Sequence, residues 1–372
     1  MLIGVPKEIK THEYRVGLVP SSVRELVHHG HRVLVETGAG NGIGCADADY
    51  ERAGAEIVPD AATVFARAEM IVKVKEPQPQ EVEMLREGQV LFTYLHLAAD
   101  RRLTEGLMQS GCVAIAYETV TDARGRLPLL APMSEVAGRM SIQVGAHYLE
   151  KMNGGAGILL GGVPGVQAGR VVVIGGGVAG TNAIRVAMGM EAQVYVLDRS
   201  LSRLYELDLQ FGAMLNTIYA TVDAIETHVV MADLLIGAVL VPGHAAPKLI
   251  SREMIRAMRP GSVFVDISID QGGCSETSRP TTHADPVYVE EGVIHYCVTN
   301  MPGAVPRTST FALNNATLPF VLALATKGWK QALRDDPHLA DGLNVCHGRL
   351  VYQAIADDLG LPYTPRAAVL GA

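Results

Sequence analysis

The chain has 372 residues, of which 48% are hydrophobic and 19% charged, and its formal net charge is −8. This length predicts two domains, each large enough to bury its own core. The 39 glycines and the low aromatic content are typical of an α/β enzyme rather than of a disordered or fibrous chain. An acidic chain without a basic stripe is a poor partner for nucleic acid, so we expect no nucleic-acid binding.

The cysteines indicate a reducing compartment. The five are scattered and none is spaced as C-x-x-C, which argues against a disulfide framework and against a zinc site. A signal peptide has a long apolar region behind a basic head, and the N-terminal MLIGVPKEIK lacks this pattern. The uncharged run from Thr308 to Thr326 contains two asparagines and a proline, so we interpret it as a buried helix. We therefore expect a cytoplasmic protein with no metal and no membrane association.

Short apolar runs alternate with amphipathic ones through residues 1–128. The apolar runs are LIGVP, HRVLVE, IVKVK, QVLFTYLH and CVAIAYE. Such alternation predicts β-α units around a parallel sheet. The glycine-rich stretch from Gly38 to Gly44 lacks nucleotide-binding spacing, so we interpret it as a loop.

Polar side chains stand where three of these strands end. The alternation in IVKVK predicts Lys73 and Lys75 on one face, His96 ends QVLFTYLH, and Arg15 lies in the turn after LIGVP. Open α/β sheets bind ligands outside the carboxyl ends of their strands. Taken alone, however, a lysine here is more often a solvated charge, a lone histidine is as often structural, and Arg15 fits an ordinary loop cluster.

The strongest motif is the run from Arg170 to Gly180, RVVVIGGGVAG. An apolar strand leads into Gly175-x-Gly177-x-x-Gly180, which then opens a helix. This context predicts a dinucleotide-binding turn with the pyrophosphate at the helix N-terminus. The next strand ends in Asp198, where a carboxylate holds a ribose 2′-hydroxyl and repels a 2′-phosphate, so we favour NAD over NADP; Arg199 beside it is the counter-evidence.

Later segments complete the predicted organisation. A long helix is expected from Met133 to Met152 with Ser134 as its N-cap, and the strands MADLLIGAVL, SVFVDISID and VIHYCVTN complete a six-strand Rossmann plan. Beyond Arg307 the sequence reads as helices only. We therefore predict an α/β fold of two doubly wound Rossmann-like domains, in which an NAD-binding domain (129–306) is inserted into a discontinuous substrate domain (1–128 and 307–372).

Several motifs together resemble those of the bacterial L-alanine dehydrogenase family, over essentially the whole chain. They are MLIGVPKEIKTHEYRVGLVP, VKVKEP, TYLHLA, PMSEVAGRMSIQVGAHYLE, VVVIGGGVAGTNA, DISIDQGG and VTNMPGAVPRTST. The fold is also similar to the first domains of proton-translocating transhydrogenase and to lysine-forming saccharopine dehydrogenase. The HLA and SIDQGG contexts fit alanine dehydrogenase better.

The resemblance implies reversible oxidative deamination of L-alanine, with NAD and water, to pyruvate, ammonium and NADH. It implies that Arg15 and Lys75 hold the substrate carboxylate and that His96 and Asp270 form the proton donor and acceptor pair. Met133 and Asn300 would lie beside the substrate and the nicotinamide. A further set of residues would line the cofactor: Ser134, Gly175, Gly177, Val178, Ala179, Gly180, Asp198, Arg203, Val239, Leu240, Ile267, Ser268, Ile269, Arg279, Val298 and Met301.

One residue departs from the family pattern, and the sequence leaves two alternative functions open. Ala220 stands where the family often has a serine that touches the adenosine, which puts about 0.5–1.5 kcal/mol of one hydrogen bond in doubt. A related dehydrogenase acting on glyoxylate or on a larger 2-amino acid is the nearest rival. A catalytically silent NAD-binding protein is another, but it should lack one of Arg15, Lys75, His96 and Asp270, and the sequence keeps all four. The family also implies a homo-hexamer.

Overall fold

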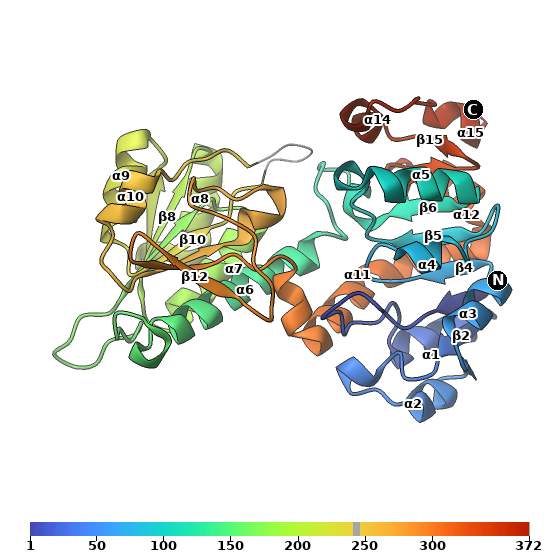
Figure 1. Cartoon of the computed structure of the whole chain (residues 1–372), viewed down its shortest axis with the longest axis horizontal. Coiled ribbons are helices and arrows are strands. Elements are labelled where there is room, and N and C mark those ends of the chain that lie inside the picture. The colour runs from blue at the N-terminus through green and yellow to red at the C-terminus, as the bar shows by residue number, and fades with distance from the viewer. Residues whose placement is uncertain (241–245, 372) are drawn as a thin grey trace. The chain divides into compact units, whose positions relative to one another are not determined.

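The computed structural model describes residues 1–240 and 246–371, which form two compact units (Figure 1). The first unit contains Met1–Met133 and Val305–Ala372, and the second contains Ser134–Ala304. Each unit has its own sheet, and in each sheet parallel pairs dominate. The predicted α/β class is therefore confirmed.

The first unit is built on an eight-stranded sheet in the order β15-β14-β6-β5-β4-β1-β2-β3. The strands from β3 to β6 run parallel and follow the doubly wound order, and the side on which successive strands are added to the sheet reverses between β1 and β4, which is the switch point. The strands are β1 (Leu2–Val5), β2 (Arg32–Glu36), β3 (Glu56–Val58), β4 (Met70–Val72), β5 (Val90–Thr93), β6 (Val113–Ala116), β14 (Leu343–Cys346) and β15 (Arg349–Leu350).

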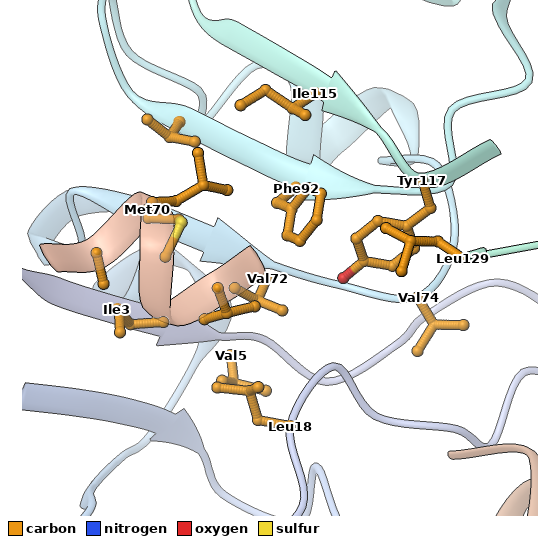
Figure 2. Close-up of a cluster of buried hydrophobic side chains, with 14 of the residues drawn as sticks. Ile3, Val5, Leu18, Met70, Val72, Val74, Phe92, Ile115, Tyr117 and Leu129 are labelled. Carbon is orange, nitrogen blue, oxygen red and sulfur yellow. The ribbon is translucent and has the colours of Figure 1, made fainter. Parts of the chain in front are cut away.

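Helices cover both faces of this sheet. They are α1 (Pro20–His28), α2 (Asp47–Arg52), α3 (Ala61–Arg67), α4 (Pro79–Val82), α5 (Arg101–Ser110), α11 (Pro306–Lys327), α12 (Trp329–Asp335), α13 (Pro337–Ala340), α14 (Gln353–Leu359) and α15 (Arg366–Leu370). Because successive side chains of a strand point to opposite faces, the sheet separates two cores. One contains Val5 and Phe92 (Figure 2) together with Leu313 of α11, and the other contains Leu91 and Phe65 of α3.

Helix α11 ties the C-terminal segment to the first loop of the chain. Its Asn314 side chain is buried and accepts the backbone N–H of Val19 at 2.9 Å, while it donates to the carbonyl of Gly17 at 3.1 Å. Buried amide groups of this kind need such partners, because an unsatisfied group costs about 1–3 kcal/mol. Within the described residues, no helix is both long and apolar enough to span a bilayer.

The second unit has a seven-stranded sheet in the order β12-β13-β11-β10-β7-β8-β9, and only β12 is antiparallel. The strands are β7 (Arg170–Ile174), β8 (Gln193–Asp198), β9 (Leu215–Tyr219), β10 (Leu234–Gly237), β11 (Val263–Asp266), β12 (Val287–Glu290) and β13 (Val293–Tyr296). The helices are α6 (Ala131–Tyr148), which begins at the end of the first unit, α7 (Val178–Gly189), α8 (Leu201–Phe211), α9 (Val222–Met231) and α10 (Arg252–Ala257). The sheet has the six parallel strands of the predicted plan, of which β9 was not identified from the sequence, and the switch point lies between β7 and β10.

Three local predictions are wrong. The segment after Arg307 is not helical throughout, because the buried residues Leu343–Cys346 form β14, which pairs antiparallel with β6. Ser134 is not an N-cap, because α6 already begins at Ala131 and places Ser134 within the helix. The strand expected through Lys75 ends at Val72, where the backbone leaves the ladder.

Candidate active site

The loop after β1 carries Arg15 and is packed tightly between two other segments. A Cβ on Gly17 would lie 2.2 Å from the carbonyl oxygen of Val72 at the end of β4. A Cβ on Gly42 would lie 2.3 Å from the carbonyl oxygen of Tyr14. Glycine is therefore needed at both positions, and the stretch interpreted only as a loop supports the segment that holds Arg15.

The guanidinium of Arg15 is buried and fixed by Glu13. Its Nε donates to Oε1 at 2.7 Å and its Nη2 to Oε2 at 2.5 Å, while Nη1 lies 3.1 Å from the sulfur of Met133. Burial by itself raises the pKa of Glu13, but the hydrogen bonds and charge of Arg15 outweigh burial and leave that pKa below its ordinary value. The pair is thus charged, and Met133 lies next to the Arg15 guanidinium.

Lys75 follows β4 beside a buried ionic triad. The ammonium of Lys73 lies 3.2 Å from Glu8 and 2.6 Å from Glu81, and all three side chains are buried. Burial lowers the pKa of Lys73, but attraction to both carboxylates outweighs it and raises the pKa above its ordinary value. Glu8 also accepts the backbone N–H groups of Val74, at 2.7 Å, and Lys75, at 3.2 Å. Lys73 is therefore a structural cation, and Glu8 fixes the backbone that carries Lys75.

His96 lies three residues beyond β5 and is exposed. Its backbone is left-handed, with φ of 51° and ψ of 39°. The imidazole stacks on the ring of Tyr94, with ring centroids 5.8 Å apart and an interplanar angle of 10°. Tyr94 is buried, and its hydroxyl donates to the carbonyl of Leu129 at 2.5 Å.

Arg15, Lys75 and His96 therefore follow three neighbouring strands, β1, β4 and β5, at the switch point of the first sheet. Ligands bind at such points in open α/β sheets. Two cations at one sheet edge suit a small ligand with a carboxylate. An imidazole beside them suits proton exchange with an atom next to that carboxylate.

The glycine turn of the second unit has the geometry that a dinucleotide needs. Gly175 adopts φ of +99°, and a Cβ on Gly180 would lie 1.9 Å from the carbonyl oxygen of Gly175. A Cβ on Gly177, by contrast, would meet no atom within 4 Å. Open space in front of Gly177 at the N-terminus of α7 suits a pyrophosphate, which the helix N–H groups would bind.

Asp198 and Arg203 brace this turn from β8 and α8. Asp198 Oδ2 accepts the N–H of Gly176 at 2.8 Å, and Arg203 Nε donates to the Gly176 carbonyl at 2.7 Å. Arg203 Nη2 also donates to the hydroxyl of Thr181 at 2.6 Å. The half-buried Asp198 thus stands beside the turn, at the strand end where a ribose hydroxyl would be held.

Asp270 lies in η6 (Ile267–Gln271), directly after β11, and is exposed. The loop is shaped by Asp266, which accepts the backbone N–H of Ser268 at 3.0 Å and that of Cys274 at 2.9 Å. Burial raises the pKa of Asp266 above its ordinary value, against four hydrogen bonds that lower it. The Ser268 hydroxyl in turn accepts the backbone N–H of Val239 at 2.9 Å, so the loops after β10 and β11 are joined.

The remaining predicted residues are also in the second unit. Asn300 has a left-handed backbone, with φ of 62°, and precedes η7 (Met301–Ala304). The guanidinium of Arg279 lies over the ring of Tyr288, 3.8 Å from its centroid. Val178, Leu240 and Arg279 are exposed, Ala179, Ser134, Val239 and Ile267 are partly buried, and Ile269, Val298 and Met301 are buried.

Sequence reasoning missed the carboxylates behind these residues: Glu8, Glu13 and Asp266. A weak signal existed, because Glu8 and Glu13 stand in the same charged turn as Arg15. The described residues contain no cluster of three or more His, Cys, Asp or Glu side chains able to hold a metal, and all five cysteines are buried and free.

Known proteins match this chain over its whole length. Residues 4–137 match the family described as alanine dehydrogenase/PNT, N-terminal domain, and residues 141–353 match its C-terminal domain. Proteins named alanine dehydrogenase from Halomonas elongata and Bacillus subtilis are 62% and 54% identical to this chain. Both alignments cover 100% of this chain, together with 100% of the first protein and 98% of the second.

Solved structures agree with these relatives. A structure titled L-alanine dehydrogenase superposes with a TM-score of 0.94 at 56% identity, covering 97% of this chain and 99% of its own. A transhydrogenase from Sinorhizobium meliloti superposes with a TM-score of 0.84 at 24% identity, covering 94% of this chain and 100% of its own, and shares the fold. The chain therefore belongs to the alanine dehydrogenase/PNT family.

Proposed function

We propose that this protein is an NAD-dependent L-alanine dehydrogenase, which converts L-alanine, NAD⁺ and water reversibly to pyruvate, ammonium, NADH and a proton. The observation that carries the proposal is the full-length identity of 62% to an alanine dehydrogenase. The grouping of Arg15, Lys75 and His96 at one sheet edge supports it. The identity and this grouping of side chains therefore favour an amino-acid oxidoreductase over a silent binding protein.

Arg15 and Lys75 bind the substrate carboxylate. Charge-assisted hydrogen bonds of this kind contribute roughly 1.5–3 kcal/mol each. Glu13 keeps the guanidinium in one orientation, and Glu8 fixes the backbone at Lys75. A substrate held by two cations exposes its Cα–H in a single direction, which lowers the entropic cost of hydride transfer. Met133, in contact with Arg15, lies beside the bound carboxylate.

NAD, when bound, supplies the hydride acceptor. The turn Gly175–Gly180 holds its pyrophosphate, Asp198 holds the ribose next to the adenine, and Arg203 braces the turn. The other cofactor contacts come from Ser134, Val239, Leu240, Ile267, Ser268, Ile269, Arg279, Val298 and Met301. Asn300 lies next to the nicotinamide end. Asp198 favours NAD over NADP because its carboxylate repels a 2′-phosphate.

His96 and Asp270 move the protons. Loss of hydride from Cα leaves an imine on the substrate, which must add water and then release ammonia to give the ketone. These steps need a group that takes a proton from water and one that gives a proton to nitrogen. A positioned side chain of each kind typically contributes about 10²–10⁴-fold.

The test is NADH formation by the purified protein with L-alanine and NAD. We expect turnover with alanine, little with NADP, and a loss of about 10²–10⁴-fold in kcat for His96→Ala with NADH binding retained. Glycine, serine, lysine and glyoxylate with ammonium serve as alternative substrates. Absence of alanine turnover in a protein that binds NADH would contradict the proposal and favour a related dehydrogenase or a silent binder.

Assembly and location are proposed from the family alone. We propose a homo-hexamer located in the cytoplasm, without partners other than its small substrates. Sedimentation of the purified chain measures the first, and a smaller particle would contradict it.

A further inference from the structure

His96 has a left-handed backbone, which is uncommon for residues other than glycine. With φ of 51° and ψ of 39° it lies in the left-handed region, where the Cβ of an L-residue crowds the backbone. Such residues persist only where their surroundings fix them. The groups that fix the backbone of His96 therefore also decide where its imidazole points.

The carboxylate of Glu118 fixes this backbone. Glu118 lies in η3 (Tyr117–Thr119), directly after β6. Its Oε1 accepts the N–H of His96 at 2.6 Å and that of Leu95 at 3.1 Å, and its Oε2 lies 3.2 Å from the Leu95 nitrogen. Two successive N–H groups directed at one anion form a backbone nest, and hydrogen bonds to a charged acceptor are stronger than neutral ones.

The same segment supports the histidine ring. Tyr94, which stacks on the imidazole, packs edge-on against Tyr117, with centroids 5.1 Å apart and planes at 82°. Tyr117 lies beside Phe92 and Leu129 (Figure 2), and its hydroxyl donates to the carbonyl of Lys73 at 3.0 Å. Tyr117 and Glu118 thus support the ring and the backbone of the same residue.

We propose that Glu118 is a positioning residue for His96, holding residues 95 and 96 in the turn that presents the imidazole for proton transfer. The inference rests on the proposed role of His96. Separate carboxylates, Glu13 and Glu8, organise Arg15 and Lys75. Loss of Glu118 should therefore affect the proton transfers and leave binding of the substrate carboxylate intact.

Kinetics of Glu118→Ala and Glu118→Gln test the proposal in the full-length enzyme. We expect kcat to fall by about 10- to 100-fold for Glu118→Ala, because a misplacement of about 1 Å costs on the order of 10²-fold. The fall should be smaller for Glu118→Gln, whose amide oxygen still accepts an N–H. KM for alanine and the affinity for NADH should stay within about twofold. Asp60→Asn is the matched control, since Asp60 also accepts a backbone N–H, that of Thr63 at 2.8 Å, but at a helix N-terminus.

A double variant separates positioning from a general loss of structure. If Glu118 acts through His96, Glu118→Gln should not lower the residual kcat of His96→Ala further. An equal loss in both backgrounds, or an unchanged kcat in Glu118→Gln, would overturn the inference. Full activity of His96→Ala alone would instead overturn the role of His96. The Gln variant decides the question even if Glu118→Ala does not fold.

Discussion

The orientation of Arg15 depends on a planar group that meets Glu13 at two nitrogens while a third faces Met133. Lysine has one ammonium and cannot reproduce this fork. We predict that Arg15→Lys raises KM for alanine roughly tenfold to a hundredfold, corresponding to one charge-assisted hydrogen bond of about 1.5–3 kcal/mol. NADH affinity, measured by fluorescence titration, should not change.

The exposed ion pair between Arg67 and Glu56 provides the control for this substitution. It also joins two guanidinium nitrogens to one carboxylate, here Nη1 and Nη2, at 2.6 and 3.0 Å. Arg67→Lys should leave KM unchanged. An unchanged KM in Arg15→Lys as well would show that Arg15 does not bind the substrate.

For single residues, the sequence shows where a side chain lies relative to a strand better than it shows which groups that side chain contacts. Arg15 and His96 could be singled out because they follow predicted strands, where open sheets bind ligands. Lys73 and Lys75 looked equivalent, yet Lys73 is fully buried between Glu8 and Glu81. The difference is tertiary: the strand ends early, and the acidic partners come from two other segments.

Within the turn that opens α7, glycine serves two separable purposes. A Cβ at position 180 would lie 1.9 Å from the carbonyl oxygen of Gly175, whereas one at position 177 would meet nothing within 4 Å. We predict that Gly180→Ala lowers both stability, by about 1–3 kcal/mol, and NADH affinity. Gly177→Ala should leave the melting temperature unchanged but lower the affinity for NADH by about tenfold or more, since the methyl group enters the space proposed for the pyrophosphate.

Gly189, the last residue of α7, is the control for both variants. It also has open space around its Cβ position, and alanine favours a helix by roughly 0.5–1 kcal/mol over glycine. Gly189→Ala should keep full NADH affinity. Equal NADH affinities for the Gly177→Ala and Gly189→Ala proteins would show that the pyrophosphate does not bind at this turn.

The β12–β13 hairpin is joined to α10 by charge. Glu291, in its turn, accepts hydrogen bonds from Arg256 and Arg252, which lower its pKa from 4.5 to about 2. A lowered pKa contributes stability that is present above pH 4.5 and is lost as the pH falls toward 2. We predict that Glu291→Gln melts below the wild type above pH 4.5 and that the gap closes toward pH 2. The exposed Glu226 supplies the control substitution, and a gap independent of pH would contradict the linkage.

Elements with strong local patterns could be predicted, and short ones could not. The buried strand β7 and its glycine turn are visible as an apolar run before a fixed spacing. Strand β12 was missed, although a two-residue turn, Glu291-Gly292, separates it from β13, because glutamate is not a typical residue at positive φ. Strand β14 was missed because a stretch of four residues is too short to show a periodicity, and pairing with β6 and β15 defines it.

At the scale of the whole chain, specific hydrogen bonds attach the C-terminal segment to the N-terminal loops of the first unit. Asn314 binds the loop that follows Arg15, and Arg307 donates to the carbonyl of Ile43 at 2.5 Å. The sequence shows that helices follow Arg307 but cannot show which loop they hold. The first unit therefore needs both of its segments, whereas the second unit is one continuous stretch.

This difference predicts that a fragment of residues 129–304 folds alone and binds NADH. It retains α6, whose Gly138 approaches α7 so closely that a Cβ would lie 2.1 Å from the Ala179 carbonyl, and a complete seven-stranded sheet. We expect NADH affinity close to that of the full chain by fluorescence titration. Alanine turnover should be absent, because Arg15, Lys75 and His96 are missing. A folded fragment that fails to bind NADH would mean that residues of the first unit complete the cofactor site.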